Sequence, residues 1–91
     1  MNKDGILQQR AIELRSLLEK YAKTDSDVDD FLKRFMPWFE KISKGEITPP
    51  NYDYRLSIYF SNPDFSPLAE RYMGHELGKA EAEFTKAICD W

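Results

Sequence analysis

The sequence predicts an all-α fold, a small bundle of three to four helices in which residues 1–91 form a single helical domain. Apolar residues recur at helical spacing in two long segments and again at the end of the chain. A length of 91 residues suits one domain with one core. Only residues 46–65 depart from this pattern, and there we expect an irregular or short extended segment rich in aromatic side chains.

Two amphipathic helices are predicted in the first half of the chain. The first covers about residues 4–22, and the second starts at a capping residue within 24–26 and ends at Gly45. Pro37 lies inside the second pattern, but the apolar phase continues across it, so we expect one kinked helix there. The two apolar stripes are Leu7, Ala11, Leu14, Leu18 and Tyr21, then Val28, Phe31, Leu32, Phe35, Phe39 and Ile42.

The stretch "YDYRLSIYF", residues 52–60, alternates larger apolar and polar side chains. A period of two is typical of a half-buried strand, yet no other stretch offers a partner strand. We therefore prefer a short helix, with Asp53 as its N-cap and Leu56 and Phe60 as buried anchors. An extended segment covered by the bundle, or a strand paired with another chain, is the alternative.

The last helical region opens at Ser66 as N-cap, followed by Pro67 in the first turn. Gly74 and Gly78 interrupt the pattern around "GHELG", so a short first piece precedes the final helix. That helix is expected from about Lys79. Its apolar stripe is Ala80, Phe84, Ala87, Ile88 and Trp91.

Charge and composition narrow the classes of function. The net charge is −3. The four aspartates within residues 24–30 carry more negative charge than this, so the rest of the chain sums to +1. A chain without clustered Lys and Arg is a poor nucleic-acid binder, and no uninterrupted apolar run is long enough for a membrane span. With a single cysteine, Cys89, and no apolar leader segment, we expect a cytoplasmic protein without disulfides.

No group of residues predicts catalysis. His75 and Cys89 are the only residues of their kinds, and no third group accompanies them as in a nucleophilic triad. The aspartate cluster begins like a calcium loop but has Asp30 where the loop needs glycine and Met36 where it needs glutamate. Gly-rich phosphate loops are also missing. We expect no enzymatic activity, no metal site and no cofactor.

The residues that point to a function are tyrosines and aspartates. Tyrosine provides a large and rather rigid contact surface with a polar tip, and it is frequent at the energetic centres of protein interfaces. Carboxylates nearby would attract a basic partner. The plainer interpretation is that the rings complete a small core and that the aspartates cap a helix. The predicted partner-binding residues are Asp27, Asp29, Asp30, Tyr52, Asp53, Tyr54, Tyr59 and Asp64.

Two motifs resemble the immunity proteins of nuclease colicins, which are small acidic bacterial proteins. "SDVDDFLKRF" is similar to the acidic opening of that family's second helix, and "IYFSNPDFSP" to its short third helix and the turn after it. The resemblance sets Tyr59 and Phe60 on the family's Tyr-Tyr pair and Asp64 on its acidic turn. It implies a four-helix fold that inhibits a basic nuclease domain. Phe60 replaces the second tyrosine, and "GHELG" has no counterpart.

The sequence thus predicts a small acidic cytoplasmic protein-binding domain, with neutralisation of a basic toxin as its most specific form. The alternative is a self-associating structural domain that dimerises through residues 52–60. The protein would be a monomer in the first case and a homodimer in the second.

Overall fold

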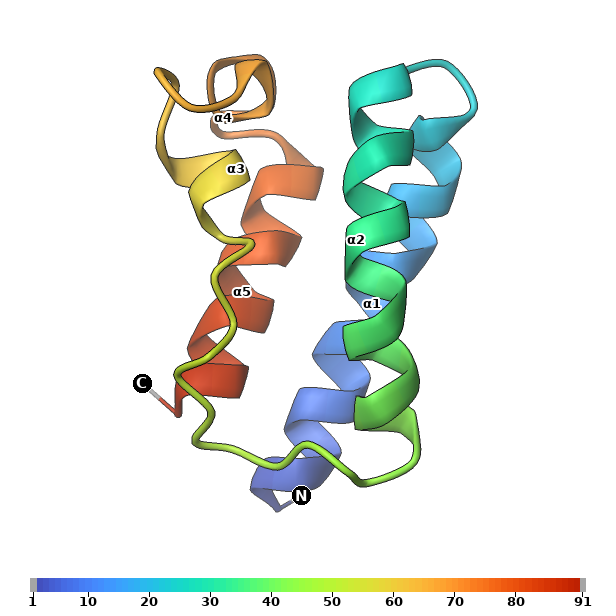
Figure 1. Cartoon of the computed structure of the whole chain (residues 1–91), viewed down its shortest axis with the longest axis vertical. Coiled ribbons are helices and arrows are strands. Elements are labelled where there is room, and N and C mark those ends of the chain that lie inside the picture. Colours follow the sequence, from blue (N-terminus) through green and yellow to red (C-terminus); the bar gives the residue numbers. More distant parts are fainter. Residues whose placement is uncertain (1, 91) are drawn as a thin grey trace.

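The computed structural model describes residues 2–90, which form five helices and no strand. This confirms the predicted all-α class. Helices α1 and α2 run side by side on one side of Figure 1, and α3, α4 and α5 lie on the other. None of the helices in the described range is both long and apolar enough to cross a membrane. The helices are α1 Lys3–Ala22, α2 Ser26–Ser43, α3 Ile58–Ser61, α4 Pro67–Arg71 and α5 Glu76–Cys89.

Helix α1 packs against both α2 and α5, so it is the central member of a three-helix core. The start of α1 lies beside the end of α5, where Lys3 Nζ and Asp90 Oδ2 are 2.6 Å apart. Both chain ends are therefore at the same end of the bundle (Figure 1). Four residues of the predicted α1 stripe are buried, as the helical spacing required: Leu7, Ala11, Leu14 and Leu18.

Helix α2 is a single helix that continues through Pro37, as its apolar phase predicts. It ends at the predicted glycine, because Gly45 adopts a φ of +76°, which glycine tolerates without strain. The Gly45 amide donates to Ile42 O and the Glu46 amide donates to Lys41 O, at 3.1 and 2.8 Å. These two bonds are the Schellman pattern that closes the carboxyl end of a helix.

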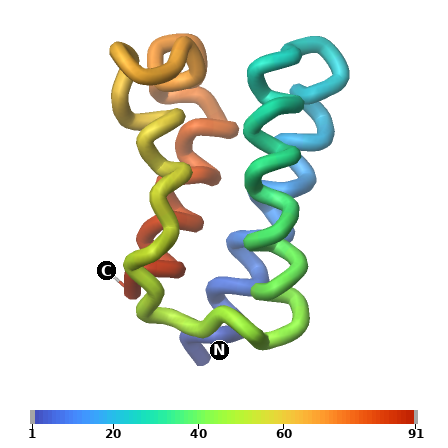
Figure 2. The backbone as a smooth tube through the Cα atoms, in the orientation of Figure 1, coloured from blue at the N-terminus to red at the C-terminus, as the bar shows by residue number. Residues whose placement is uncertain are grey.

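Residues 46–57 contain no regular secondary structure; they cross from the end of α2 to the end of α5 and then run back along α5 (Figure 2). The expected N-cap at Asp53 is wrong, because α3 begins only at Ile58, after Ser57. The Asp53 amide instead donates to Asn51 Oδ1 at 2.9 Å and closes a local turn. Leu56 and Phe60 are half-buried, so they are not the main anchors. Tyr54, with 5% of its surface exposed, has that role.

The last helical region begins as predicted, since the Ser66 hydroxyl accepts the Leu68 amide and Pro67 opens α4. The expected start of the final helix at Lys79 is wrong by three residues. His75 caps α5, and its Nδ1 accepts the Leu77 amide at 3.1 Å. Gly78 therefore lies inside α5, where a Cβ would collide with the backbone carbonyl of Tyr72. Trp91 of the predicted stripe lies outside the described residues.

Tyr54 joins the irregular segment to the core. Its ring makes edge contacts with Trp38 of α2 and Phe84 of α5, at centroid distances of 5.5 and 5.0 Å. Its hydroxyl donates to Glu81 Oε2 at 2.9 Å, and Thr85 donates to the same oxygen at 2.9 Å. Burial raises the pKa of Glu81, and these two hydrogen bonds only partly oppose that effect.

Glu81→Gln is expected to stabilise the protein at neutral pH, because the amide oxygen still accepts both hydroxyls and carries no charge. The folded pKa of Glu81 is raised, so the wild type loses stability as pH rises from the ordinary value of 4.5 through that folded pKa. Urea unfolding across this range should show the two proteins converging at low pH and diverging above it. A constant difference in stability at all pH values would contradict a raised pKa of Glu81 in the folded protein.

Glu81→Ala provides the matched comparison. It leaves the buried Tyr54 hydroxyl without an acceptor and should lower the free energy of unfolding by about 1–3 kcal/mol. Opposite signs for the two Glu81 variants would separate the cost of the charge from the value of the hydrogen bonds.

Candidate protein-binding site

Tyr59 lies on α3 against the first half of α2. Its ring meets the edge of Phe31 at 5.6 Å and that of Phe65 at 5.0 Å between centroids. The Arg34 guanidinium is 5.9 Å from the Tyr59 centroid and covers another part of the ring. Tyr59 is half-buried, whereas Phe65 is 53% exposed. An aromatic pair is thus held in place by Phe31 while one of its rings faces solvent.

Two predicted aspartates are neighbours in sequence of residues that contact this pair or belong to it. Asp64 is exposed and directly precedes Phe65, in a turn where its amide donates to Asn62 Oδ1 at 3.0 Å. Asp30 is exposed on α2, one turn before Arg34 and so on the same side of the helix. Within residues 2–90, Asp30 forms no ion pair. We call Asp30, Tyr59, Asp64 and Phe65 the aromatic–acidic face.

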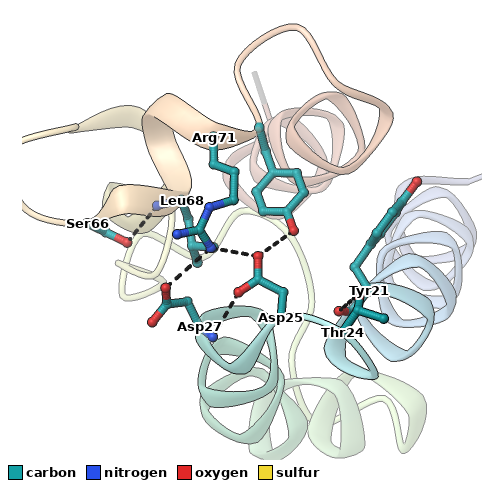
Figure 3. A network of polar contacts seen from close by, with 8 residues as sticks. Tyr21, Thr24, Asp25, Asp27, Ser66, Leu68 and Arg71 are labelled. Atoms are coloured by element: carbon teal, nitrogen blue, oxygen red, sulfur yellow. Dashed lines mark hydrogen bonds and ion pairs between the residues drawn. The ribbon is translucent and has the colours of Figure 1, made fainter.

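The first aspartates of α2 have a structural role. Asp25 is the N-cap, and its side chain accepts the Asp27 amide at 3.0 Å. Arg71 of α4 donates to Asp25 at 2.6 Å and to Asp27 at 3.3 Å (Figure 3). The Tyr72 hydroxyl donates to the same Asp25 oxygen at 2.6 Å. We call Asp25, Asp27, Arg71 and Tyr72 the α2–α4 clamp.

The contacts within the α2–α4 clamp shift the pKa values of Asp25 and Tyr72. Burial alone would raise the pKa of Asp25, but the hydrogen bonds from Tyr72, Arg71 and the Asp27 amide outweigh it and hold that pKa below its ordinary value. Burial and the bond to Asp25 raise the pKa of Tyr72 to about 12. Asp25 is therefore ionised and Tyr72 protonated at neutral pH, the pairing that the hydrogen bond requires.

Three of the four aspartates within residues 24–30 therefore form ion pairs with basic residues of the protein itself. Asp25 and Asp27 share Arg71, and Asp29 Oδ2 lies 3.1 Å from Lys33 Nζ one turn further along α2. Asp27 and Asp29 are half-buried and so only partly available to a partner. Of the three α2 aspartates predicted to bind a partner, Asp30 is the one that is exposed and forms no ion pair within residues 2–90.

The structure separates the remaining predicted residues from this face. Tyr54 is buried, so its prediction as a partner-binding residue fails: the ring fills the core between two helices. Tyr52 is 65% exposed but follows Asn51, whose amide donates to Ile88 O near the end of α5. Asp53 is next to it in the same turn. Tyr52 and Asp53 therefore lie at a different level of the bundle from Tyr59.

Sequence reasoning missed Phe65, Arg71 and Tyr72. In the sequence Phe65 lies among turn residues, and only its exposure in the structure distinguishes it from an aromatic residue of the core. Arg71 and Tyr72 act on Asp25 across more than forty positions of sequence, at separations of 46 and 47. No local pattern reports a contact of that range.

The side chains of residues 2–90 are not arranged for metal binding or for a Cys–His nucleophile pair. Across residues 2–90, no three His, Cys, Asp or Glu side chains converge in a way that could hold a metal ion. His75 and Cys89 stand at opposite ends of α5, so about 20 Å of helix separates the only imidazole from the only thiol. They cannot act as a nucleophile and its base.

Comparison of the chain with family models, with curated proteins and with solved structures finds no match in any of the three. The function must accordingly be argued from the site itself.

Asp25→Ala should lower the free energy of unfolding by about 2–3 kcal/mol, because it removes an N-cap worth about 1 kcal/mol and leaves the buried Tyr72 hydroxyl without its acceptor. Urea denaturation at neutral pH measures this loss. Asp29→Ala is the matched control and should leave the midpoint almost unchanged, since its pair with Lys33 is exposed. Equal effects of the two variants would show that the α2–α4 clamp adds nothing to the free energy of unfolding.

Proposed function

We propose that this protein is a binding domain for a basic protein partner and that the aromatic–acidic face makes the contact. The observation that carries the proposal is the exposed Phe65 ring in edge contact with Tyr59, together with the exposed carboxylates of Asp64, its neighbour in sequence, and of Asp30 on α2. Aromatic anchors surrounded by charges complementary to the partner are the usual composition of an energetic centre at an interface.

The face is also ordered before any partner arrives. Phe31 holds Tyr59 and Phe60 by edge contacts at 5.6 and 4.9 Å, and the α2–α4 clamp fixes the opening of α2 against α4. A preordered face loses little side-chain and loop entropy on binding, which favours affinity. In the most specific form of the proposal, the partner is the basic nuclease domain of a bacterial toxin, which this protein inhibits. That form rests on the resemblance of the second-helix and third-helix motifs to colicin immunity proteins.

Tyr59→Ala and Asp30→Asn should each weaken binding to the partner by about thirtyfold, the effect of losing about 2 kcal/mol at an interface centre. Calorimetry against a panel of inactivated basic nuclease domains measures this, with nuclease inhibition as the functional assay. Affinity should also fall as salt rises.

Tyr52→Ala is the matched tyrosine control and Asp4→Asn the matched charge control, and both should bind like the wild type. Circular dichroism must show that each variant keeps its fold. Wild-type affinity in both face variants, or an equal loss in Tyr52→Ala, would refute this choice of face.

One observation favours the second candidate function, self-association through residues 52–60. Tyr52 and Ile58 are exposed at 65% and 37%, and the amides of residues 52 and 54–57 donate to no backbone carbonyl within residues 2–90. Such an extended edge is available for pairing with a second copy. Tyr54 opposes this, because strand pairing that turned its side chain outward would empty the core site.

Sedimentation equilibrium at micromolar concentration should give the mass of one chain, since the aromatic–acidic face does not depend on a dimer. A dimer that Tyr52→Asp dissociates and Tyr59→Ala does not would instead establish self-association through residues 52–60.

A further inference from the structure

A cavity of about 380 Å³ lies between α3 and α5. This is within the range of about 300–1,000 Å³ that is usual for ligand pockets. Phe60 and Ser61 line it from α3, and Gly78, Ala82 and Thr85 line it from α5. The exposed wall is mainly apolar, and the only carboxyl group among the lining residues is that of Glu81.

Glu81 is an unusual residue for such a wall. It is 3% exposed, and a buried carboxylate normally has partners for both oxygens. Here Oε2 accepts the hydroxyls of both Tyr54 and Thr85, while Oε1 has no hydrogen-bond partner within residues 2–90 and, unlike Arg15 Nε, is not fully shielded from solvent. Oε1 is thus accessible to a donor that enters from the cavity, and the charge of a bound cation would oppose the rise that burial causes in the pKa of Glu81.

We propose that this cavity receives a lysine side chain of the protein partner. The aliphatic stem would pack along Phe60 and Ala82, and the ammonium would donate to Glu81 Oε1. Lysine fits better than arginine, because a guanidinium binds a carboxylate best through two free oxygens and Glu81 offers one. The proposal rests on the proposed function for the source of the lysine, but not for the chemistry of the site.

The cationic residue that lines the cavity does not fill this role. Lys86 is at the rim of the cavity, with its side chain 60% exposed and its Nζ 3.5 Å from Glu83 Oε1. It stands five residues after Glu81 on α5 and is held toward solvent by this pair. As a like charge near the entrance, Lys86 should oppose an incoming ammonium.

The test is a titration of ¹⁵N-labelled protein with Nα-acetyl-lysine methylamide, followed by amide chemical shifts. Saturable shifts should centre on Gly78, Ala82 and Thr85. The norleucine analogue, which has the apolar stem alone, should bind at least about tenfold more weakly, the value of one charge-assisted hydrogen bond. The arginine analogue should also bind more weakly than the lysine compound, because its planar fork finds only one free oxygen. Equal binding of norleucine, or shifts centred outside the cavity, would overturn the proposal.

Variants of the protein provide the second arm. Glu81→Gln should weaken the lysine compound at least about tenfold while remaining folded, as its thermal melt would verify, and Lys86→Met should strengthen it. Glu19→Gln, the same change at an exposed site on α1, should have no effect. Unchanged affinity in Glu81→Gln would overturn the proposal.

This test needs no partner protein, so its failure is distinguishable from failure of the proposed function. Lysine binding that depends on Glu81, together with wild-type partner binding by Tyr59→Ala and Asp30→Asn, would refute the aromatic–acidic face alone. Weakened partner binding by Tyr59→Ala and Asp30→Asn, together with lysine binding that does not depend on Glu81, would refute the lysine site alone.

Discussion

The burial of Tyr54 is the constraint on which the second half of the structure depends. Residues 46–57 have no regular secondary structure to hold them, and their most buried side chain, Tyr54, lies between Trp38 and Phe84 with its hydroxyl on Glu81. Once Tyr54 is in place, the chain is positioned to deliver α3 beside α2, where Tyr59 and Phe60 meet Phe31. The aromatic–acidic face is the outer surface of that contact, so an element without helix or strand is what positions the candidate site.

Most of the negative charge at the start of α2 serves the fold. The aspartates at the start of α2 cap the helix, interact favourably with its dipole and hold α4 through Arg71. Asp30 and Asp64 are exposed and are the charges of the proposed aromatic–acidic face. Counting aspartates would overstate the acidity of this surface. Glu81 shows the opposite case, a carboxylate buried at a cost in stability, and the structure gives it two hydroxyl partners and one open oxygen.

The sequence was informative where structure is local. Helical spacing predicted the buried residues of α1 and α2, and Gly45, Ser66 and Pro67 marked helix ends through backbone chemistry that needs only near neighbours. It failed where contacts cross the chain. Tyr54 and Glu81 are 27 positions apart and Asp25 and Arg71 are 46, so neither the buried role of Tyr54 nor the α2–α4 clamp left a local pattern. The start of α5 was misplaced for a related reason: Gly78 suggested a break, but it is there to admit the Tyr72 carbonyl.

The central claim is that residues 52–66, of which only α3 is helical, are as rigid as the long helices chiefly because side chains such as Tyr54 anchor them, and ¹⁵N relaxation tests it most directly. Backbone order parameters across this segment should be close to 0.85, roughly the value of rigid backbone, and should fall in Tyr54→Ala while those of α1 stay unchanged. Order parameters below about 0.6 for the same residues in the wild type would contradict the account, because the aromatic–acidic face would then have no fixed geometry.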